Sequence, residues 1–443
     1  LAAAAALLAP ATARAQADDN LGACVAELRR ELPRRAPVSA ASFDEYTRGA
    51  QDLRPLIRDA SGAQPEFTRK IWDYLARLVD AQRIDDGRAL LAREQPALQR
   101  VAERERVDAA TVVAVFGVET DYGKVRGRHK VIDTTLSRAC LRMSSDERRG
   151  HFFAALRLLQ EGLVAPDDFM GSWAGAFGLT QFMPGTFIQY RTDGDADGRV
   201  DIYGSVPDAL ATTARFLRGL GWVDGRPWGV EVRAPRAVVE RWSAAEAQHG
   251  CLRGGGERCK RLADWLGLGV AGMGGQALAD AAQRLGADTP LALLAPAGAD
   301  GPAWLVTPNY RALWGYNHAD AYALAIGLLS DALRGSTPSS AALQRTPWPT
   351  DDPGLSRAGV RELQALLRQR GRCEVTADGA DGPLTIAAIR AEEKQRGWPE
   401  SGRAANRLLA ALQKDATAAA AAAPACADAA AAAAPSQASA PPR

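Results

Sequence analysis

The chain has few histidines and cysteines and a small net charge. Only 4 histidines occur in 443 residues, and none of the 6 cysteines stand in a Cys-x-x-Cys spacing, so a zinc site is not expected. The 54 basic and 52 acidic residues leave a net charge of +2, which excludes the strong positive field of a nucleic-acid-binding protein. Beyond the N-terminus no apolar run approaches the roughly 20 residues that span a bilayer. We therefore expect a globular protein without a membrane-spanning helix.

The first residues, LAAAAALLAPATARAQADDN, join an apolar alanine-leucine run to a small-residue cleavage pattern. This is typical of a secretory signal, here over residues 1–17 and without its basic start. The sequence thus predicts an exported, soluble, periplasmic protein. The stretch LGAC ending at Cys24 loosely resembles a lipoprotein box, but the polar residues 18–20 separate it from the apolar run. Lipid anchoring at Cys24 is therefore disfavoured.

The cysteines form an even set, as expected of disulfides in an oxidising compartment. Cys251 and Cys259 flank a short loop and are the easiest pair to close. The further expected pairs are Cys24 with Cys140 and Cys373 with Cys426.

The length predicts two or three domains, and an apolar content of 47% is enough for a core. Helical periodicity dominates, so the fold class is mainly α, with a small irregular or β insertion between 221 and 301. The predicted divisions are a signal at 1–17, a main domain at 18–335, a linker at 336–353, a small helical domain at 354–413 and a disordered Ala/Pro-rich tail at 414–443.

One early segment, 66–83, has the periodicity of a single amphipathic helix. Its predicted core-facing stripe consists of Phe67, Ile71, Tyr74, Leu75 and Leu78. We interpret this stripe as packing and nothing more specific.

The most informative stretch is DAATVVAVFGVETDYG, from Asp108 to Gly123. Asp108 can cap a helix of small and apolar residues, and Gly123 allows the chain to turn away. Glu119 stands at the end of this helix with an apolar run behind it. An apolar wall raises the pKa of a carboxyl group, as a general acid requires. The alternative is that Glu119 is the solvated last turn of a core helix.

A second stretch, GSWAGAFGLTQFMPGTF at 171–187, is rich in glycine and aromatic residues. Trp173, Phe177 and Phe182 offer flat faces, while Ser172 and Gln181 offer hydrogen bonds. Pyranose rings have an apolar face and a polar rim, so this combination favours a glycan site. The alternative is a tightly packed turn with structural aromatics.

Four motifs together carry a family resemblance. GVETDYG, GSWAGAFGLTQFMPGTF, DGDADGRVDIYGS and TPNYRALWGYNHADAYALAIG resemble, in order and spacing, the B-type lytic murein transglycosylases. The resemblance covers about Cys24 to Arg334. It implies a lysozyme-like helical domain that cleaves the β-1,4 bond between N-acetylmuramic acid and N-acetylglucosamine in peptidoglycan. The expected partner is the glycan strand of peptidoglycan, and the protein is expected to be a monomer.

Site residues follow from the resemblance by position. Glu119 is implied to be the single catalytic acid and base, Ser172 and Gln181 to bind glycan, and the pair Tyr316 and Asn317 to lie beside the carboxylate. One carboxylate suffices if the substrate does the work of the second one: its acetamido group stabilises the oxocarbenium centre and its 6-hydroxyl replaces water. The product then has a 1,6-anhydro end. Phe177 and Leu179 depart from the family pattern. The other nearby acids, Asp121 and Asp133, are expected to face solvent or cap structure.

The aspartate-rich loop that begins at Asp193 has the spacing of an EF-hand. Its expected oxygen ligands are Asp193, Asp195, Asp197 and Asp201. Gly204 stands where a bidentate glutamate belongs, and Asp208 could replace it. The family has a calcium loop here, so structural calcium is favoured over an empty turn, and no other cofactor is required.

The C-terminal segment 355–412 resembles the three-helix peptidoglycan-binding domain. Glu392, Glu393 and Ser401 depart from its usual residues, which predicts a weakened core or ligand groove. Two alternatives to a transglycosylase remain: a hydrolytic muramidase on the same scaffold, and a non-catalytic cell-wall-binding protein. An acid with a raised pKa argues against the second, because a pure binder has no need of one.

Overall fold

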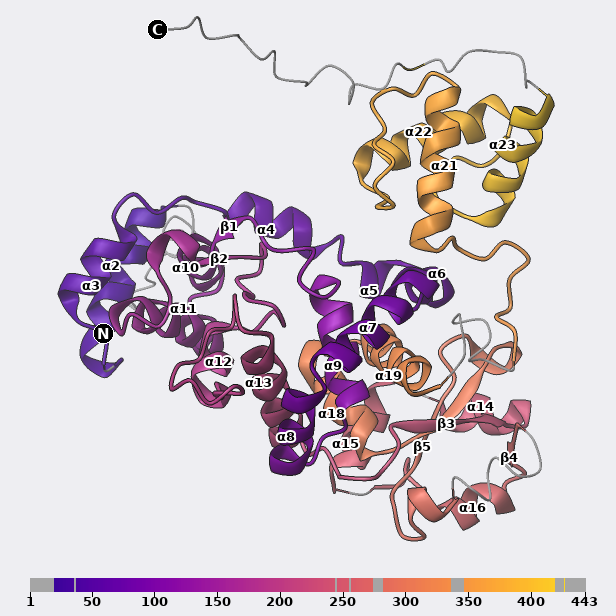
Figure 1. Ribbon diagram of the computed structural model, residues 1–443, viewed down its shortest axis with the longest axis horizontal. Coiled ribbons are helices and arrows are strands. Elements are labelled where there is room, and N and C mark those ends of the chain that lie inside the picture. The colour runs from indigo at the N-terminus through magenta and orange to yellow at the C-terminus, as the bar shows by residue number, and fades with distance from the viewer. Residues whose placement is uncertain are drawn as a thin grey trace, which may run out of the picture. The chain divides into compact units, whose positions relative to one another are not determined.

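The computed structural model describes residues 20–35, 37–243, 245–254, 256–273, 282–335, 346–418 and 426. The fold is mainly helical (Figure 1) and forms two compact units. Unit 1 comprises Leu1–Arg69 and Arg83–Pro347, and unit 2 comprises Lys70–Gln82 and Trp348–Arg443. The predicted signal, residues 336–345 of the predicted linker and nearly all of the predicted tail lie outside the described residues.

The helices of unit 1 surround a central pair, α9 and α19. They are α2 (Leu21–Glu31), α3 (Ala40–Thr47), α4 (Arg54–Ser61), α5 (Pro65–Thr68), α7 (Ala81–Arg93), α8 (Gln95–Glu105), α9 (Ala109–Thr120), α10 (Val131–Leu141), α11 (Asp146–Gln160), α12 (Pro184–Tyr190), α13 (Val206–Gly219), α14 (Arg236–Trp242), α15 (Ala245–Gly254), α16 (Leu262–Gly267), α18 (Pro308–Asn317) and α19 (Asp320–Arg334). Helix α7 begins in the last residues of the Lys70–Gln82 segment.

Helix α9 begins as the sequence predicts. The Asp108 side chain accepts a hydrogen bond from the amide of Thr111 at 3.1 Å, and residues 110–117 are all buried. The chain leaves the helix earlier than expected, because Asp121 and Tyr122 already have left-handed φ values of 52° and 60° before Gly123 does. A helix this apolar must be surrounded by protein, and α19, itself buried along most of its length, covers it.

The predicted β insertion is a four-stranded antiparallel sheet of order β4-β3-β6-β5. Its strands are β3 (Gly229–Arg233), β4 (Ala271–Gly272), β5 (Ala292–Leu294) and β6 (Ala303–Val306), and Val230 pairs with Leu305. Trp265, Leu293 and Leu305 lie in the core beneath it. A two-stranded pairing of β1 (His129–Lys130) with β2 (Met170–Gly171) lies elsewhere in unit 1.

The predicted single helix over 66–83 is wrong. Arg69 and Lys70 are extended, with ψ of 153° and 138°, and they separate α5 from α6 (Ile71–Leu78). A second break at Val79, with φ of −125° and ψ of 58°, precedes α7. Tyr74 and Leu75 are buried as expected, but Phe67 is 60% exposed. Helix α6 belongs to unit 2, which the predicted division at 336–353 does not anticipate.

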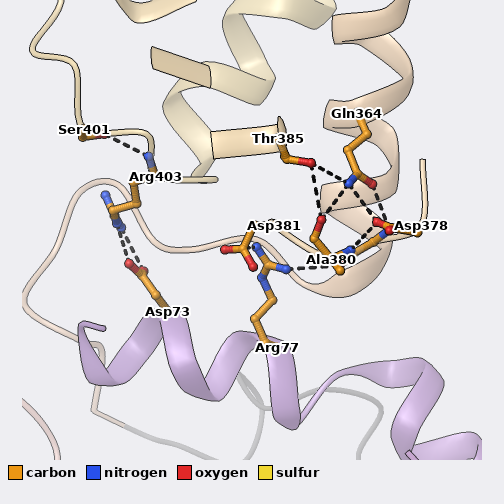
Figure 2. Close-up of polar contacts among 10 residues, drawn as sticks. Asp73, Arg77, Gln364, Asp378, Ala380, Asp381, Thr385, Ser401 and Arg403 are labelled. Atoms are coloured by element: carbon orange, nitrogen blue, oxygen red, sulfur yellow. Dashed lines mark hydrogen bonds and ion pairs between the residues drawn. The ribbon is translucent and has the colours of Figure 1, made fainter. Parts of the chain in front are cut away.

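Unit 2 combines α6 with α21 (Arg357–Gln369), α22 (Pro383–Gln395) and α23 (Asn406–Ala418). Arginine-aspartate ion pairs join α6 to the rest of the unit (Figure 2). Asp73 accepts from Arg403 Nη2 at 2.9 Å, and Arg77 lies 2.9 Å from Asp381. Just beyond α6, the buried Asp80 accepts from Arg357 Nη2 at 2.9 Å.

A buried glutamine holds the loop between α21 and α22. Gln364 donates to Ala380 O at 2.8 Å and to Thr385 Oγ1 at 3.1 Å, and its own oxygen accepts from the Gly379 amide at 2.8 Å (Figure 2). This loop carries Asp381 towards Arg77, so the same glutamine supports an ion pair with α6.

The unusual acids of α22 are buried and partnered. Glu392 accepts from Arg370 Nε at 2.9 Å. Glu393 accepts from Ser401 Oγ at 2.5 Å and from the Gly402 amide at 2.7 Å. The Ser401 hydroxyl therefore suits Glu393, since it donates a hydrogen bond to the carboxylate, whereas an aspartate at this position would repel that carboxylate. The expected weakening of the core is offset by these bonds.

The three predicted disulfides are confirmed: Cys24–Cys140, Cys251–Cys259 and Cys373–Cys426. Because the Cys24 sulfur is used in a disulfide, it cannot also carry a lipid thioether, in agreement with the disfavoured lipoprotein box. No helix in the described part of the chain combines the length and apolarity needed to cross a membrane.

Candidate active site

Glu119 lies in the last turn of α9 and is half-buried. Burial raises the pKa of its carboxyl group to about 8, a hydrogen bond from Tyr322 opposes that rise, and the charge of Glu66 adds to it. Tyr322, in the first turn of α19, donates its phenol to Glu119 Oε1. The predicted environment of Glu119 is therefore confirmed, and the alternative of a solvated helix end is wrong.

The end of α18 supplies the predicted Tyr-Asn pair. The Tyr316 phenol donates to the Thr180 carbonyl at 2.7 Å, and its ring stacks on that of Tyr322 at 6.1 Å. Burial and the charge of Glu119 raise the pKa of Tyr316 well above its ordinary value. Asn317 Nδ2 donates to Glu66 Oε1 at 3.2 Å. Tyr316 and Asn317 thus each contact a group that also acts on Glu119.

The glycine-rich segment is fixed to the end of α9 by one buried side chain. Thr120, the residue after Glu119, donates its hydroxyl to the Leu179 carbonyl at 2.6 Å. The same oxygen accepts from the Gly123 amide at 3.0 Å. Leu179 is buried, so its departure from a polar residue changes packing, while its backbone still makes the link.

Within that segment Ser172 and Gln181 are half-buried and held by nearby backbone. The Ser172 oxygen accepts from the amides of Ala174 at 3.3 Å and Ala176 at 3.1 Å, which leaves its proton for donation. Gln181 has a left-handed φ of 52° and donates to the Gly178 carbonyl at 2.9 Å. It follows Thr180, whose carbonyl accepts from Tyr316, so this part of the segment lies next to the end of α18.

Two of the three aromatics proposed as sugar platforms are core residues. Phe177 and Phe182 are 0% and 1% exposed, and Phe177 packs edge-on against Phe169 at 5.1 Å. The expectation that they present flat faces to a glycan is wrong, because the segment folds back on itself and buries them. Trp173 is half-buried.

Of the two expected roles for Asp121 and Asp133, solvent exposure does not hold, whereas capping does hold for Asp121, which is the C-cap of α9. Asp121 is buried and lies 3.4 Å from Arg83 Nη2. Asp133 is buried in the first turn of α10, where burial raises its pKa and a backbone bond from Gln51 opposes the rise. Both acids serve structure.

The aspartate loop partly matches its predicted ligand set. Oxygens of Asp193, Asp195 and Asp197 all lie within 4.8 Å of one another, and such a hard-oxygen set fits calcium. Asp201 is not in this group, and its Oδ1 accepts from the amides of Tyr203 and Gly204, each at 2.9 Å. Asp208 is buried and accepts from the Gly194 and Asp201 amides, so it braces the loop from behind.

Sequence reasoning missed two residues of the site. Tyr322 lies within the motif TPNYRALWGYNHADAYALAIG. The feature that could have indicated its role is a single phenol near the start of a largely apolar helix. Glu66 lies far before Glu119 in the sequence, and no pattern in the residues around it indicates a role in the site. Its position depends on where the short helix α5 packs, namely against α19.

Comparison with known proteins identifies the scaffold. Residues 20–331 match the family described as Transglycosylase SLT domain, and residues 356–412 match Putative peptidoglycan binding domain. The chain belongs to the SLT-domain transglycosylase family. This transglycosylase is 26% identical over 287 residues to Membrane-bound lytic murein transglycosylase B of Escherichia coli (strain K12), a match that covers 62% of this chain and 70% of that protein.

Solved structures agree with this assignment. SltB3 from Pseudomonas aeruginosa, in complex with NAG-anhNAM-pentapeptide, is 36% identical to this chain with a TM-score of 0.63. The match covers 89% of this chain and 99% of the SltB3 chain. The Escherichia coli lytic transglycosylase Slt35, in complex with calcium, is 20% identical with a TM-score of 0.58, over 70% of this chain and 92% of its own. The second likeness shows a shared fold.

Proposed function

We propose that this transglycosylase cleaves the β-1,4 bond between N-acetylmuramic acid and N-acetylglucosamine in peptidoglycan without water, leaving 1,6-anhydromuramic acid ends. The observation that carries the proposal is the state of Glu119. A carboxyl group with a pKa of about 8 is mostly protonated at neutral pH, so it can act as a general acid there.

The reaction needs Glu119 twice. Its proton passes to the glycosidic oxygen as the bond from that oxygen to C1 breaks, and the oxygen keeps the bonding electron pair. The substrate's acetamido oxygen stabilises the positive charge that develops at C1. The substrate's 6-hydroxyl then attacks C1 and returns its proton to Glu119, so the enzyme ends in its starting state.

Other residues would bind and orient the glycan. Ser172 retains a hydroxyl proton to donate, and the half-buried Gln181, Tyr316 and Asn317 would offer further polar groups to the glycan. Tyr322 would hold the Glu119 carboxyl group in one orientation through both proton transfers. Asp193, Asp195 and Asp197 would hold calcium, which would stiffen the loop ahead of α13.

We further propose that the protein acts in the periplasm and that unit 2 holds it on the cell wall. Three disulfides and the signal-like N-terminus support export. The match of residues 356–412 to a peptidoglycan-binding family supports the role of unit 2.

The test is digestion of purified sacculi by wild-type protein and Glu119→Gln, with the exposed α8 acid variant Glu103→Gln as the matched control. Products that end in 1,6-anhydro sugars are expected, each lighter by one water than a muramidase product. Glu119→Gln should lose roughly 10²–10⁴-fold in rate, as for loss of a general acid. Reducing ends would show a hydrolytic muramidase. Digestion by Glu119→Gln at the wild-type rate would refute the assignment, and an inactive wild type that binds sacculi would indicate a non-catalytic binder.

A further inference from the structure

A second carboxylate, Glu66, lies close to the catalytic cluster. It stands in the short helix α5, which packs against α19, and it is half-buried. Its Oε1 accepts from Asn317 Nδ2 at 3.2 Å and from Gln64 Nε2 at 3.3 Å. The group is thus tied to the last residue of α18, next to the Tyr316 that stacks on Tyr322.

The bond to Glu66 determines which way Asn317 faces. A carboxylate can only accept, so the NH₂ of Asn317 must point to Glu66 and its amide oxygen must point elsewhere. Without Glu66 the amide could rotate and exchange donor for acceptor. With it, Asn317 offers an oxygen, which suits an N–H or O–H donor of a sugar.

The groups that act on Glu119 come from two elements, Tyr322 from α19 and Glu66 from α5, and the charge of Glu119 acts in turn on Tyr316 of α18. Tyr322 acts through its hydrogen bond and Glu66 through its negative charge. Like charges in a shared site oppose one another's ionisation, so Glu66 favours the protonated form of Glu119.

We propose that Glu66 is a positioning residue of the active site, which fixes the side-chain amide of Asn317 and presents a negative charge to Glu119. This inference rests on the proposed function. It gives the single-carboxylate site a second carboxylate that transfers no proton and forms no bond to substrate.

Two variants separate the two roles. Glu66→Gln keeps an oxygen that can accept from Asn317 and removes the charge, whereas Glu66→Ala removes both. The exposed α4 acid variant Asp59→Asn is the matched control for a lost surface charge. Turnover of purified soluble glycan strands is measured across the pH range, with kcat and KM resolved, and thermal melts establish that each variant is folded.

We expect Glu66→Gln to move the alkaline midpoint of kcat/KM to lower pH, since Glu119 then ionises more readily. Glu66→Ala should show the same movement together with a loss of kcat on the order of 10-fold to 100-fold from the misplaced amide. Asn317→Ala should add little to Glu66→Ala, because both changes remove one shared interaction.

A Glu66→Gln profile that superimposes on those of wild type and Asp59→Asn would overturn the inference. So would losses in Glu66→Ala and Asn317→Ala that simply multiply in the double variant. If Glu119→Gln is inactive while the Glu66 variants match wild type, only this inference fails. If Glu119→Gln is active, the proposed function fails with it.

Discussion

The phenol of Tyr322 donates a hydrogen bond to Oε1 of Glu119, which precedes it by 203 residues. The bond joins the last turn of α9 to the first turn of α19, and these two helices pack against each other through the centre of unit 1. The Glu119 carboxyl group is therefore oriented by two helices that pack against each other in the core of unit 1. Its direction depends on packing rather than on a mobile loop.

The first prediction concerns that bond. Tyr322→Phe removes a donor that favours the ionised carboxylate, so the pKa of Glu119 should rise and the alkaline midpoint of kcat/KM should move to higher pH. The maximal rate should also fall, on the order of 10-fold, from lost orientation. The direction is opposite to that expected for Glu66→Gln, so comparing both pH profiles provides an internal control. A downward movement in Tyr322→Phe would contradict the assigned role.

The second prediction is that the ionised Glu119 carboxylate destabilises the fold. The folded-state pKa of Glu119 is about 8, against an ordinary value of about 4.3 in the unfolded chain. Between these values folding takes up a proton, so stability falls as pH rises from about 4.3 to about 8, and the full cost remains above that.

Glu119→Gln should therefore be more stable than wild type at alkaline pH by on the order of 1–3 kcal/mol, and the two should converge below about pH 4.3. Urea unfolding at the two pH extremes measures the difference, and Glu103→Gln corrects for loss of a charge alone. Equal stability of wild type and Glu119→Gln at alkaline pH would mean that the carboxyl group pays no burial penalty.

The third prediction concerns calcium. Millimolar calcium should raise the melting temperature of wild type, because an ion that binds only the folded loop stabilises it. Asp195→Asn combined with Asp197→Asn should abolish the rise and retain most of the activity. Asp201→Asn should keep the rise, since that carboxylate lies outside the group of three aspartates whose oxygens are within 4.8 Å of one another. If calcium no longer raised the melting temperature of Asp201→Asn, Asp201 would have to be counted as a calcium ligand after all.

The fourth prediction ranks the disulfides by the loop that each one closes. Cys24–Cys140 spans 116 residues and Cys251–Cys259 spans 8. Chain entropy alone assigns about 4–5 kcal/mol to the first and about 2–3 kcal/mol to the second. Paired serine substitutions followed by denaturant unfolding should reproduce that order. A larger cost for the short loop would show that local packing, and not loop closure, dominates.

Features that depend on neighbouring residues in the sequence could be predicted, and features that depend on packing between distant elements could not. Helix α9 was predicted because its cap, Asp108, and its apolar run are contiguous, and Glu119 followed from them. Tyr322 and Glu66 were missed because their roles arise only when α19 and α5 pack near the end of α9. Phe177 and Phe182 were misread because the pattern of a buried aromatic turn and that of a sugar platform are the same along the chain. Only the folded segment decides which face is covered.

The place of α6 has a consequence for how this protein could be divided. The chain passes from unit 1 to unit 2 after Arg69, returns after Gln82, and passes again after Pro347. No single cut separates the two units. A protein truncated before Trp348 would keep Asp73 and Asp80 but lose the arginines that neutralise them, and an isolated C-terminal fragment would lack a helix of its own unit. The C-terminal part is thus not an interchangeable module, and recombination between relatives should preserve both pieces of unit 2 together.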